Sequence, residues 1–190
     1  MFPESIDSER LIFKRLCKNT LPVTELYKIV NENADNIEEL TKFLHWEPHQ
    51  NLKETEEFIE SVNEEWENRE TITYAIFTED EFIGLTSLSI KWPNKTGQMG
   101  LWLRKSAWGN GYSSERASVI FELAFEKLDL EFITVNHAVE NTKSRKAIEK
   151  YISEFNGQKD GILRNEIVTN EVKYDASIYS VSREQYFDSL

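Results

Sequence analysis

The chain has 190 residues, which is enough for one domain with a full hydrophobic core and too few for two ordinary ones. Hydrophobic residues make up 39% of it and aromatic residues 12%, so the composition excludes a disordered tail. A formal net charge of −12 argues against a nucleic-acid-binding protein, which would carry a basic face.

Three features of the sequence predict a cytoplasmic protein without a membrane segment. No apolar run approaches the ~20 residues that a membrane span needs. The first residues, MFPESIDSERL, lack the basic and then apolar layout of a signal peptide. The single cysteine, Cys17, allows no internal disulfide, which suits a reducing compartment.

Strand and helix patterns follow one another along the chain. Runs rich in β-branched and aromatic residues predict strands at residues 11–16, 71–77, 82–90, 98–103, 132–139, 162–168 and 172–181. Apolar residues at helical spacing predict helices at residues 22–32, 36–44, 52–66, 114–128 and 142–153. Asn51 and Glu54 resemble a capping box before the third helix, and turns are expected at Glu79-Asp80 and at residues 93–97. An antiparallel meander followed by strand–helix–strand units, with no repeat or linker, predicts a single α+β domain over residues 1–190.

The stretch WGNGYSSE, residues 108–115, joins an expected strand to an expected helix. Such a loop aims backbone N–H groups at one point, the positive end of the helix adds to them, and glycines let a phosphate approach closely. A P-loop would need a lysine where Tyr112 stands, and a Rossmann fingerprint would need a third glycine where Ser114 stands. Plain turn chemistry is the remaining alternative to an anion site.

An ordered series of motifs surrounds this loop. Leu101-Trp102-Leu103-Arg104 precedes it, and NTKSRKAIEK at residues 141–150 follows one helix and one strand later. The series resembles the GCN5-related N-acetyltransferases (GNAT), particularly the branch similar to RimJ and RimL, which acetylate the N-termini of ribosomal proteins. SERLIFKRL at residues 8–16 and FLHWEPH at residues 43–49 also look like that branch.

The resemblance implies a fold and an activity. The fold would be a central, mostly antiparallel mixed sheet flanked by helices, with a splayed strand at the acetyl-CoA site. Helices within about residues 22–68 would lie on the acceptor side, and about residues 98–155 would bind acetyl-CoA. The implied reaction is direct attack of a primary amine, from a protein N-terminus or a small molecule, on the acetyl thioester, without a metal. A monomer and a homodimer are both compatible with it, and neither a nucleic acid nor a membrane is expected as a partner.

Two other functions stay open beside the transferase. One is an acyl-CoA-binding sensor that has no transferase activity, because the tyrosine acid of many relatives is absent. The other is a nucleotide-binding oxidoreductase, which would need the missing third glycine.

The resemblance also assigns residues to acetyl-CoA. The pyrophosphate would lie on the glycine loop, where Trp108 replaces the usual Gln or Arg, and the pantetheine arm would pair with the splayed strand. Asn141 matches the asparagine that meets the cofactor near the pantetheine. The residues expected at the cofactor are Leu101, Trp102, Leu103, Arg104, Trp108, Gly109, Asn110, Gly111, Tyr112, Ser113, Asn141, Ser144 and Lys146.

Acetyl transfer to an amine needs a deprotonated amine, a donor for the oxyanion and a proton for the leaving thiolate. A main-chain N–H around residues 101–103 could serve the oxyanion. Ile148 stands where many relatives carry their tyrosine acid. By the RimL-like pattern, Ser144 is the candidate acid and Asp160, before Gly161, the candidate base. The alternatives are that Ser144 only hydrogen-bonds its helix and that Asp160 is a turn residue.

Charge is distributed unevenly. Residues 31–70 hold 13 acidic and three basic residues, whereas residues 141–150 hold four basic residues and one acidic residue. If the acidic helices flank the acceptor, their field predicts a cationic acceptor. The alternative is that these carboxylates are only the solvated faces of amphipathic helices.

Overall fold

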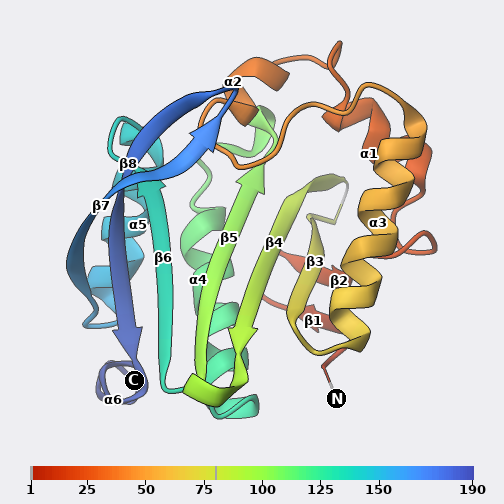
Figure 1. Ribbon diagram of the computed structural model, residues 1–190. Helices are drawn as coiled ribbons and strands as arrows, with labels where there is room; N and C mark the ends of the chain where they lie inside the picture. Colours follow the sequence, from red (N-terminus) through yellow and green to blue (C-terminus); the bar gives the residue numbers. More distant parts are fainter. Residues whose placement is uncertain (1, 80) are drawn as a thin grey trace.

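A computed structural model describes residues 2–79 and 81–190 of the chain. They form an eight-stranded sheet in the order β1-β2-β3-β4-β5-β6-β8-β7 (Figure 1). The strands are β1 Ser5–Asp7, β2 Ile12–Arg15, β3 Thr71–Phe77, β4 Phe82–Lys91, β5 Thr96–Leu103, β6 Phe132–Ala138, β7 Gln158–Thr169 and β8 Val172–Ser182. All neighbouring strands are antiparallel except β5 and β6, which are parallel. The expected α+β fold with a mostly antiparallel mixed sheet is confirmed.

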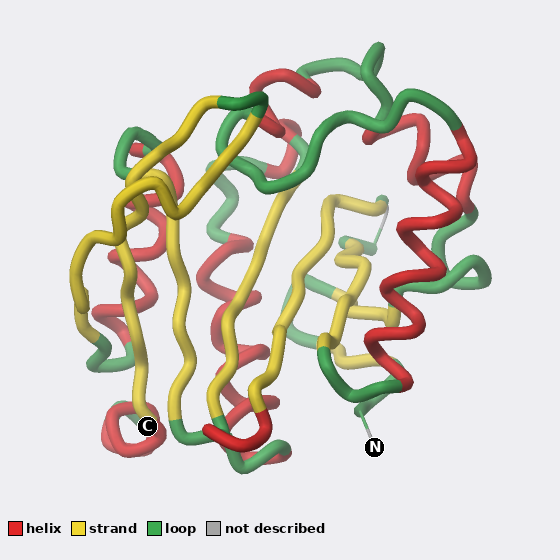
Figure 2. Tube along the Cα trace, viewed as in Figure 1, coloured by secondary structure: helices red, strands yellow, loops and turns green. Residues whose placement is uncertain are grey.

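Helices flank the sheet, as Figure 2 shows. They are α1 Val23–Val30, α2 Ile37–Thr41, α3 Leu52–Glu67, α4 Tyr112–Glu122, α5 Thr142–Glu154 and α6 Arg183–Asp188. α4 continues into a π-helical turn at Leu123–Lys127, and short 3₁₀ turns lie at Trp92–Asn94 and Lys105–Ala107. The predicted cap of α3 is present, since the Asn51 side chain accepts a hydrogen bond from the Glu54 N–H at 3.1 Å. No described helix is both long and apolar enough to cross a membrane.

Two apolar clusters account for most of the core. The larger one joins α4, α5 and their neighbours to β3, β4, β5 and β6, and its centre includes Phe121, Ile133 and Tyr151. The smaller one joins α1 and α3 to β3 and β4, through residues such as Leu26 and Ile59. β5 contributes to both clusters, so its two faces belong to different layers of the molecule.

Three expectations about elements need correction or completion. The helix expected over residues 36–44 is only α2, five residues long, and the Leu44 carbonyl beyond it accepts a hydrogen bond from the Thr169 hydroxyl instead of a helical N–H. β1 and α6 were not expected, because three-residue and six-residue elements carry too short a pattern to recognise. The turn expected at Glu79-Asp80 lies partly outside the described residues, since Asp80 is not among them.

β5 and β6 pair over only half of their length. Their register runs from Thr96 opposite Phe132 to Met99 opposite Val135. Beyond that point β5 continues to Leu103 in contact with β4 alone, and β6 continues to Ala138 in contact with β8 alone. In the described part of the chain, residues 100–103 therefore have no strand partner on the β6 side. The expected splayed strand is present, and it leaves backbone polar groups available to a ligand.

Candidate active site

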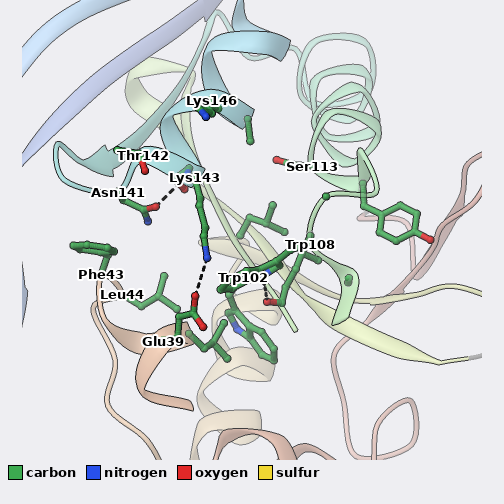
Figure 3. Close-up of a pocket in the computed structure, with 18 of the residues that line it drawn as sticks. Glu39, Phe43, Leu44, Trp102, Trp108, Ser113, Asn141, Thr142, Lys143 and Lys146 are labelled. Carbon is green, nitrogen blue, oxygen red and sulfur yellow. Dashed lines mark hydrogen bonds and ion pairs between the residues drawn. The ribbon is translucent and has the colours of Figure 1, made fainter. Parts of the chain in front are cut away.

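A cavity of about 880 Å³ lies where β5 and β6 separate (Figure 3). Its wall is built by the segment at residues 39–44, the end of β5, the glycine loop with the start of α4, and the start of α5. The residues on it are Glu39, Leu40, Lys42, Phe43, Leu44, Leu101, Trp102, Leu103, Ala107, Trp108, Gly109, Gly111, Tyr112, Ser113, Ser114, Glu140, Asn141, Thr142, Lys143, Ser144, Lys146, Ala147 and Lys150.

The two loop glycines are required by their backbone conformation. Gly109 and Gly111 have φ values of +79° and +80°, in the left-handed region that costs other L-residues energy. A Cβ added at Gly109 would meet no atom within 4 Å, and one at Gly111 would meet only the Arg10 guanidinium at 3.7 Å. The glycines are therefore not needed to relieve crowding inside the protein, and the space in front of the loop is open.

The start of α4 offers free donors beside these glycines. Its first backbone hydrogen bonds are donated by Ser114 and Glu115 to the Gly111 carbonyl, at 3.1 and 3.4 Å. The N–H groups of Tyr112 and Ser113 precede them and have no carbonyl within the helix to bind. Because both residues line the cavity at the positive end of the helix, this wall suits an anion.

Trp108 holds the loop against the strand before it. Its indole N–H donates a 2.7 Å hydrogen bond to the Leu103 carbonyl, and the Lys143 ammonium lies 4.4 Å from the centre of its ring. The side chain at the position where the resemblance expects a Gln or Arg thus packs the loop against β5 and carries the Lys143 ammonium over its ring.

Asn141 is the N-cap of α5. Its side-chain oxygen accepts a hydrogen bond from the Ser144 N–H at 3.0 Å, and both residues are half-buried at the cavity wall. The cap fixes the first turn of α5, and with it the Ser144 side chain, next to the cavity.

Glu39 reaches over the cavity to two lysines. Lys105 and Lys143 each approach one of its carboxylate oxygens at 2.7 Å, and Figure 3 shows Lys143 extending from α5 to Glu39. These two hydrogen bonds lower the pKa of Glu39 from 4.5 to about 2, and the one from Lys105 contributes most. A carboxylate held in this way is a poor proton acceptor near neutral pH.

Eleven of the fourteen residues predicted for the site lie on the cavity wall, and Arg104, Asn110 and Asp160 do not. Arg104 binds the Glu81 carboxylate at 2.8 Å. The Asn110 side chain donates to the Trp108 carbonyl at 3.2 Å. Asp160 is exposed on β7 and accepts a hydrogen bond from the Gln158 side chain at 2.9 Å. The roles assigned to all fourteen residues stay predictions.

Several wall residues were missed by the sequence reasoning. Glu39 and Leu40 carry no local motif, and only the fold places them opposite α5. Phe43 and Leu44 belong to the stretch FLHWEPH that already resembled the family, so this likeness was a usable signal. Glu140 directly precedes the motif residue Asn141, but the sequence reasoning did not single it out.

A glycine loop that begins a helix beside an opened pair of parallel strands defines a class of protein, the GNAT-type acyl-CoA-dependent transferases. Residues 10–151 match the family model described as the acetyltransferase (GNAT) domain, and the chain belongs to this family. It is therefore an acetyltransferase with acetyl-CoA as its co-substrate, and the expected superfamily is confirmed.

Comparison with individual proteins agrees with this family. The chain is 24% identical over 151 residues to the uncharacterized N-acetyltransferase p20 of Bacillus licheniformis, covering 78% of this chain and 83% of that protein. A solved structure of RimL, a ribosomal L7/L12 alpha-N-protein acetyltransferase in complex with coenzyme A, has a TM-score of 0.83 at 21% identity, covering 94% of this chain and 98% of RimL. The microcin C7 self-immunity acetyltransferase MccE, in complex with acetyl-CoA and AMP, has a TM-score of 0.83 at 22% identity, covering 95% and 97%.

The residues present fit an anionic thioester. The glycine loop is open, the splayed strand has unpaired backbone, and Lys143, Lys146 and Lys150 project from α5 at the wall. Among residues 2–79 and 81–190, no group of three or more His, Cys, Asp or Glu side chains is placed to hold a metal ion.

Proposed function

We propose that this protein transfers the acetyl group of acetyl-CoA to a primary amine that enters the cavity beside residues 39–44. The observation that carries the proposal is that the cavity reaches both faces of β5. Leu101 and Leu103 pack with the core of α4 and α5, Trp102 packs with the core of α1 and α3, and all three line the cavity. A cofactor held on the glycine loop can thus present its thioester to an acceptor on the opposite face.

The chain's own groups divide the binding task. The N–H groups at Gly111, Tyr112 and Ser113 suit the pyrophosphate, since they lie at a helix start on the wall. On the side away from β4, the backbone of residues 101–103, apart from the Leu103 carbonyl that Trp108 binds, suits the amide groups of the pantetheine arm. The side-chain oxygen of Asn141 is used in the cap of α5, so its NH₂ group is the part free to meet the cofactor.

Acetyl-CoA supplies an activated acetyl group, and the protein needs no nucleophile of its own. A backbone N–H of residues 101–103 would donate to the oxyanion that develops on the carbonyl. Ser144 on the wall is the proposed proton donor to the leaving thiolate. Asp160 is the proposed base, and because it lies outside the wall, it would act on the amine through water.

The acceptor proposed is a protein N-terminus or a small amine. RimL, similar in fold, acts on a ribosomal protein N-terminus, and MccE was solved with AMP. Of the 13 acidic residues in residues 31–70, only Glu39 lies on the cavity wall, and two lysines already bind it. The charges on the wall therefore lend little support to the expected cationic acceptor. Phe43, Leu44 and Trp102 on the wall offer apolar contacts, which favour selection of the acceptor by its shape.

Thiol release from acetyl-CoA in the presence of a panel of amines tests this function. The panel contains N-terminal peptides, polyamines, amino acids and aminoacyl nucleotides, and the control is acetyl-CoA with protein and no amine. We expect at least one amine to raise thiol release far above the control, with mass spectrometry showing an added acetyl group. Calorimetric CoA binding without release above the control for any amine would instead favour the sensor.

A further inference from the structure

The segment between β1 and β2 contacts the start of α4, about a hundred residues away in sequence. The Glu115 carboxylate in the first turn of α4 accepts a hydrogen bond from the Ser8 hydroxyl at 2.8 Å and one from the Arg10 N–H at 2.7 Å. The Arg10 guanidinium binds its other oxygen through Nε at 2.8 Å and through a terminal nitrogen at 2.7 Å. The Glu115 side chain is 14% exposed and the Arg10 side chain 46%, so the carboxylate is shielded from water while the guanidinium is partly solvated.

The same guanidinium also holds the glycine loop. Its second terminal nitrogen donates a 3.0 Å hydrogen bond to the Asn110 carbonyl, and its carbon lies 4.9 Å from the centre of the Tyr112 ring. In a planar trans peptide, the carbonyl of one residue and the N–H of the next point in opposite directions. A carbonyl of Asn110 turned toward Arg10 therefore turns the Gly111 N–H away from Arg10.

This orientation is not fixed by the loop itself. Gly109 and Gly111 flank Asn110, and glycines tolerate alternative backbone angles at little cost. If the peptide between Asn110 and Gly111 rotated, a carbonyl oxygen would face the ligand in place of a donor. A contact from outside the loop is needed to prevent this, and Arg10 makes that contact.

Charge gives the contact a second effect. A carboxylate in the first turn of α4 competes with an anionic ligand for the positive end of the helix. Hydrogen bonds and an ion pair with a cation neutralise that carboxylate, so the helix start is left for the ligand.

We propose that Arg10 is a positioning residue of the cofactor site, which holds the Gly111 N–H toward the pyrophosphate and neutralises Glu115. The proposal rests on the proposed function, in which the glycine loop binds the pyrophosphate. It extends the site to a segment that lies outside the cavity wall and that no cavity residue neighbours in sequence.

Comparison of two thioesters tests the proposal. Acetyl-CoA carries the pyrophosphate, and S-acetyl-pantetheine lacks it but keeps the reacting end. For Arg10→Ala we expect the KM of acetyl-CoA to rise about tenfold, the effect of one lost hydrogen bond, with kcat little changed. The kcat/KM for S-acetyl-pantetheine should match that of the wild type. A general loss of structure would lower the activity with both thioesters, so equal losses with both, or no loss with either, would overturn the proposal.

Two further variants guard against a folding defect. Arg15→Ala is the matched control, since Arg15 on β2 binds Glu4 at 3.1 Å and Glu67 at 2.6 Å away from the cavity, and it should leave the KM of acetyl-CoA unchanged. Arg10→Lys keeps the positive charge but lacks the planar guanidinium, which binds Glu115 and the Asn110 carbonyl through different nitrogens. Its KM for acetyl-CoA should therefore lie between those of the wild type and Arg10→Ala. A lysine variant as impaired as the alanine variant with both thioesters would also contradict the proposal.

Calorimetry with CoA separates this proposal from the proposed function. If no amine is acetylated, the dissociation constant of CoA still reports on the loop. A dissociation constant of CoA about tenfold higher in Arg10→Ala than in the wild type supports the positioning role, and an unchanged dissociation constant contradicts it.

Discussion

The backbone N–H of Ser144 donates a 3.0 Å hydrogen bond to the side-chain oxygen of Asn141, and both residues lie on the cavity wall. This bond joins the cap of α5 to the proposed proton donor. The bond uses the backbone N–H of Ser144 and leaves its hydroxyl group free of the cap. Ser144 can therefore take part in capping α5 and still donate a proton from its hydroxyl group.

The first prediction concerns that hydroxyl group. Ser144→Ala should lower kcat by roughly 10²–10⁴-fold with little change in the KM of acetyl-CoA, because it removes a proton donor used in the transition state. Ser118→Ala is a matched control, since the Ser118 hydroxyl binds only the Ser114 carbonyl of its own helix. A loss of less than about threefold would show that Ser144 serves the helix alone.

The base is tested at Asp160. If this carboxylate accepts the amine proton through water, Asp160→Asn should lower kcat/KM and change the acidic limb of the pH–rate profile. The measurement is the acidic limb of the pH–rate profile for wild type and variant. Asp160 is exposed on β7, and its carboxylate accepts a hydrogen bond from the Gln158 side chain. If Asp160→Asn leaves the acidic limb of the profile unchanged, Asp160 is not the base, and the carboxylates on the cavity wall, first Glu140, become the candidates.

Local signals in the sequence predicted the parts of the fold that local interactions determine. The strand at Thr71–Phe77 and the start of α3 after Asn51 were found from side-chain pattern and capping alone. The glycine loop was recognised from two glycines between an expected strand and an expected helix, together with the family resemblance, and the positive φ of Gly109 and Gly111 agrees with it. The splay of β5 from β6 came from the family resemblance, since no pattern in Gly100 to Leu103 shows that pairing stops.

Contacts made by distant segments were not predictable in this way. Arg10 and Glu115 are 105 positions apart, and nothing in either neighbourhood indicates the other. Glu39 and Lys143 are likewise 104 positions apart, and their pairing depends on how residues 39–44 cross the end of the sheet. Both pairs are consequences of tertiary packing, on which a single sequence carries little information.

Gly111→Val tests the glycine loop. The φ of +80° at Gly111 imposes a strain of about 1–2 kcal/mol on most other L-residues, and the first added carbon would lie 3.7 Å from the Arg10 guanidinium beside the cavity wall. We expect a modest loss of thermal stability and a severe loss of CoA affinity, measured by calorimetry on the folded variant. An unchanged affinity for CoA would show that the glycine loop does not bind the cofactor.

The last prediction concerns the carboxylate that crosses the cavity. Glu39 neutralises Lys105 and Lys143, and Glu39→Gln leaves both ammonium groups free to attract the phosphates of CoA. The dissociation constant of CoA should therefore fall severalfold at low ionic strength. The gain should shrink in 0.15 M salt, where the screening length is about 8 Å, because all three side chains are at least 40% exposed.

The pKa of Glu39 fixes how this gain varies with pH. Because the folded state lowers it from 4.5 to about 2, Glu39 stays ionised throughout the neutral range, and its ion pairs are lost only as the pH falls through about 2. The difference between variant and wild type should thus be constant from about pH 5 to pH 8. Glu25→Gln is the matched control, since it changes the net charge equally but releases Lys28 on α1, outside the cavity wall. Weaker CoA binding by Glu39→Gln alone would mean that Glu39 is needed to hold residues 39–44 over the bound cofactor.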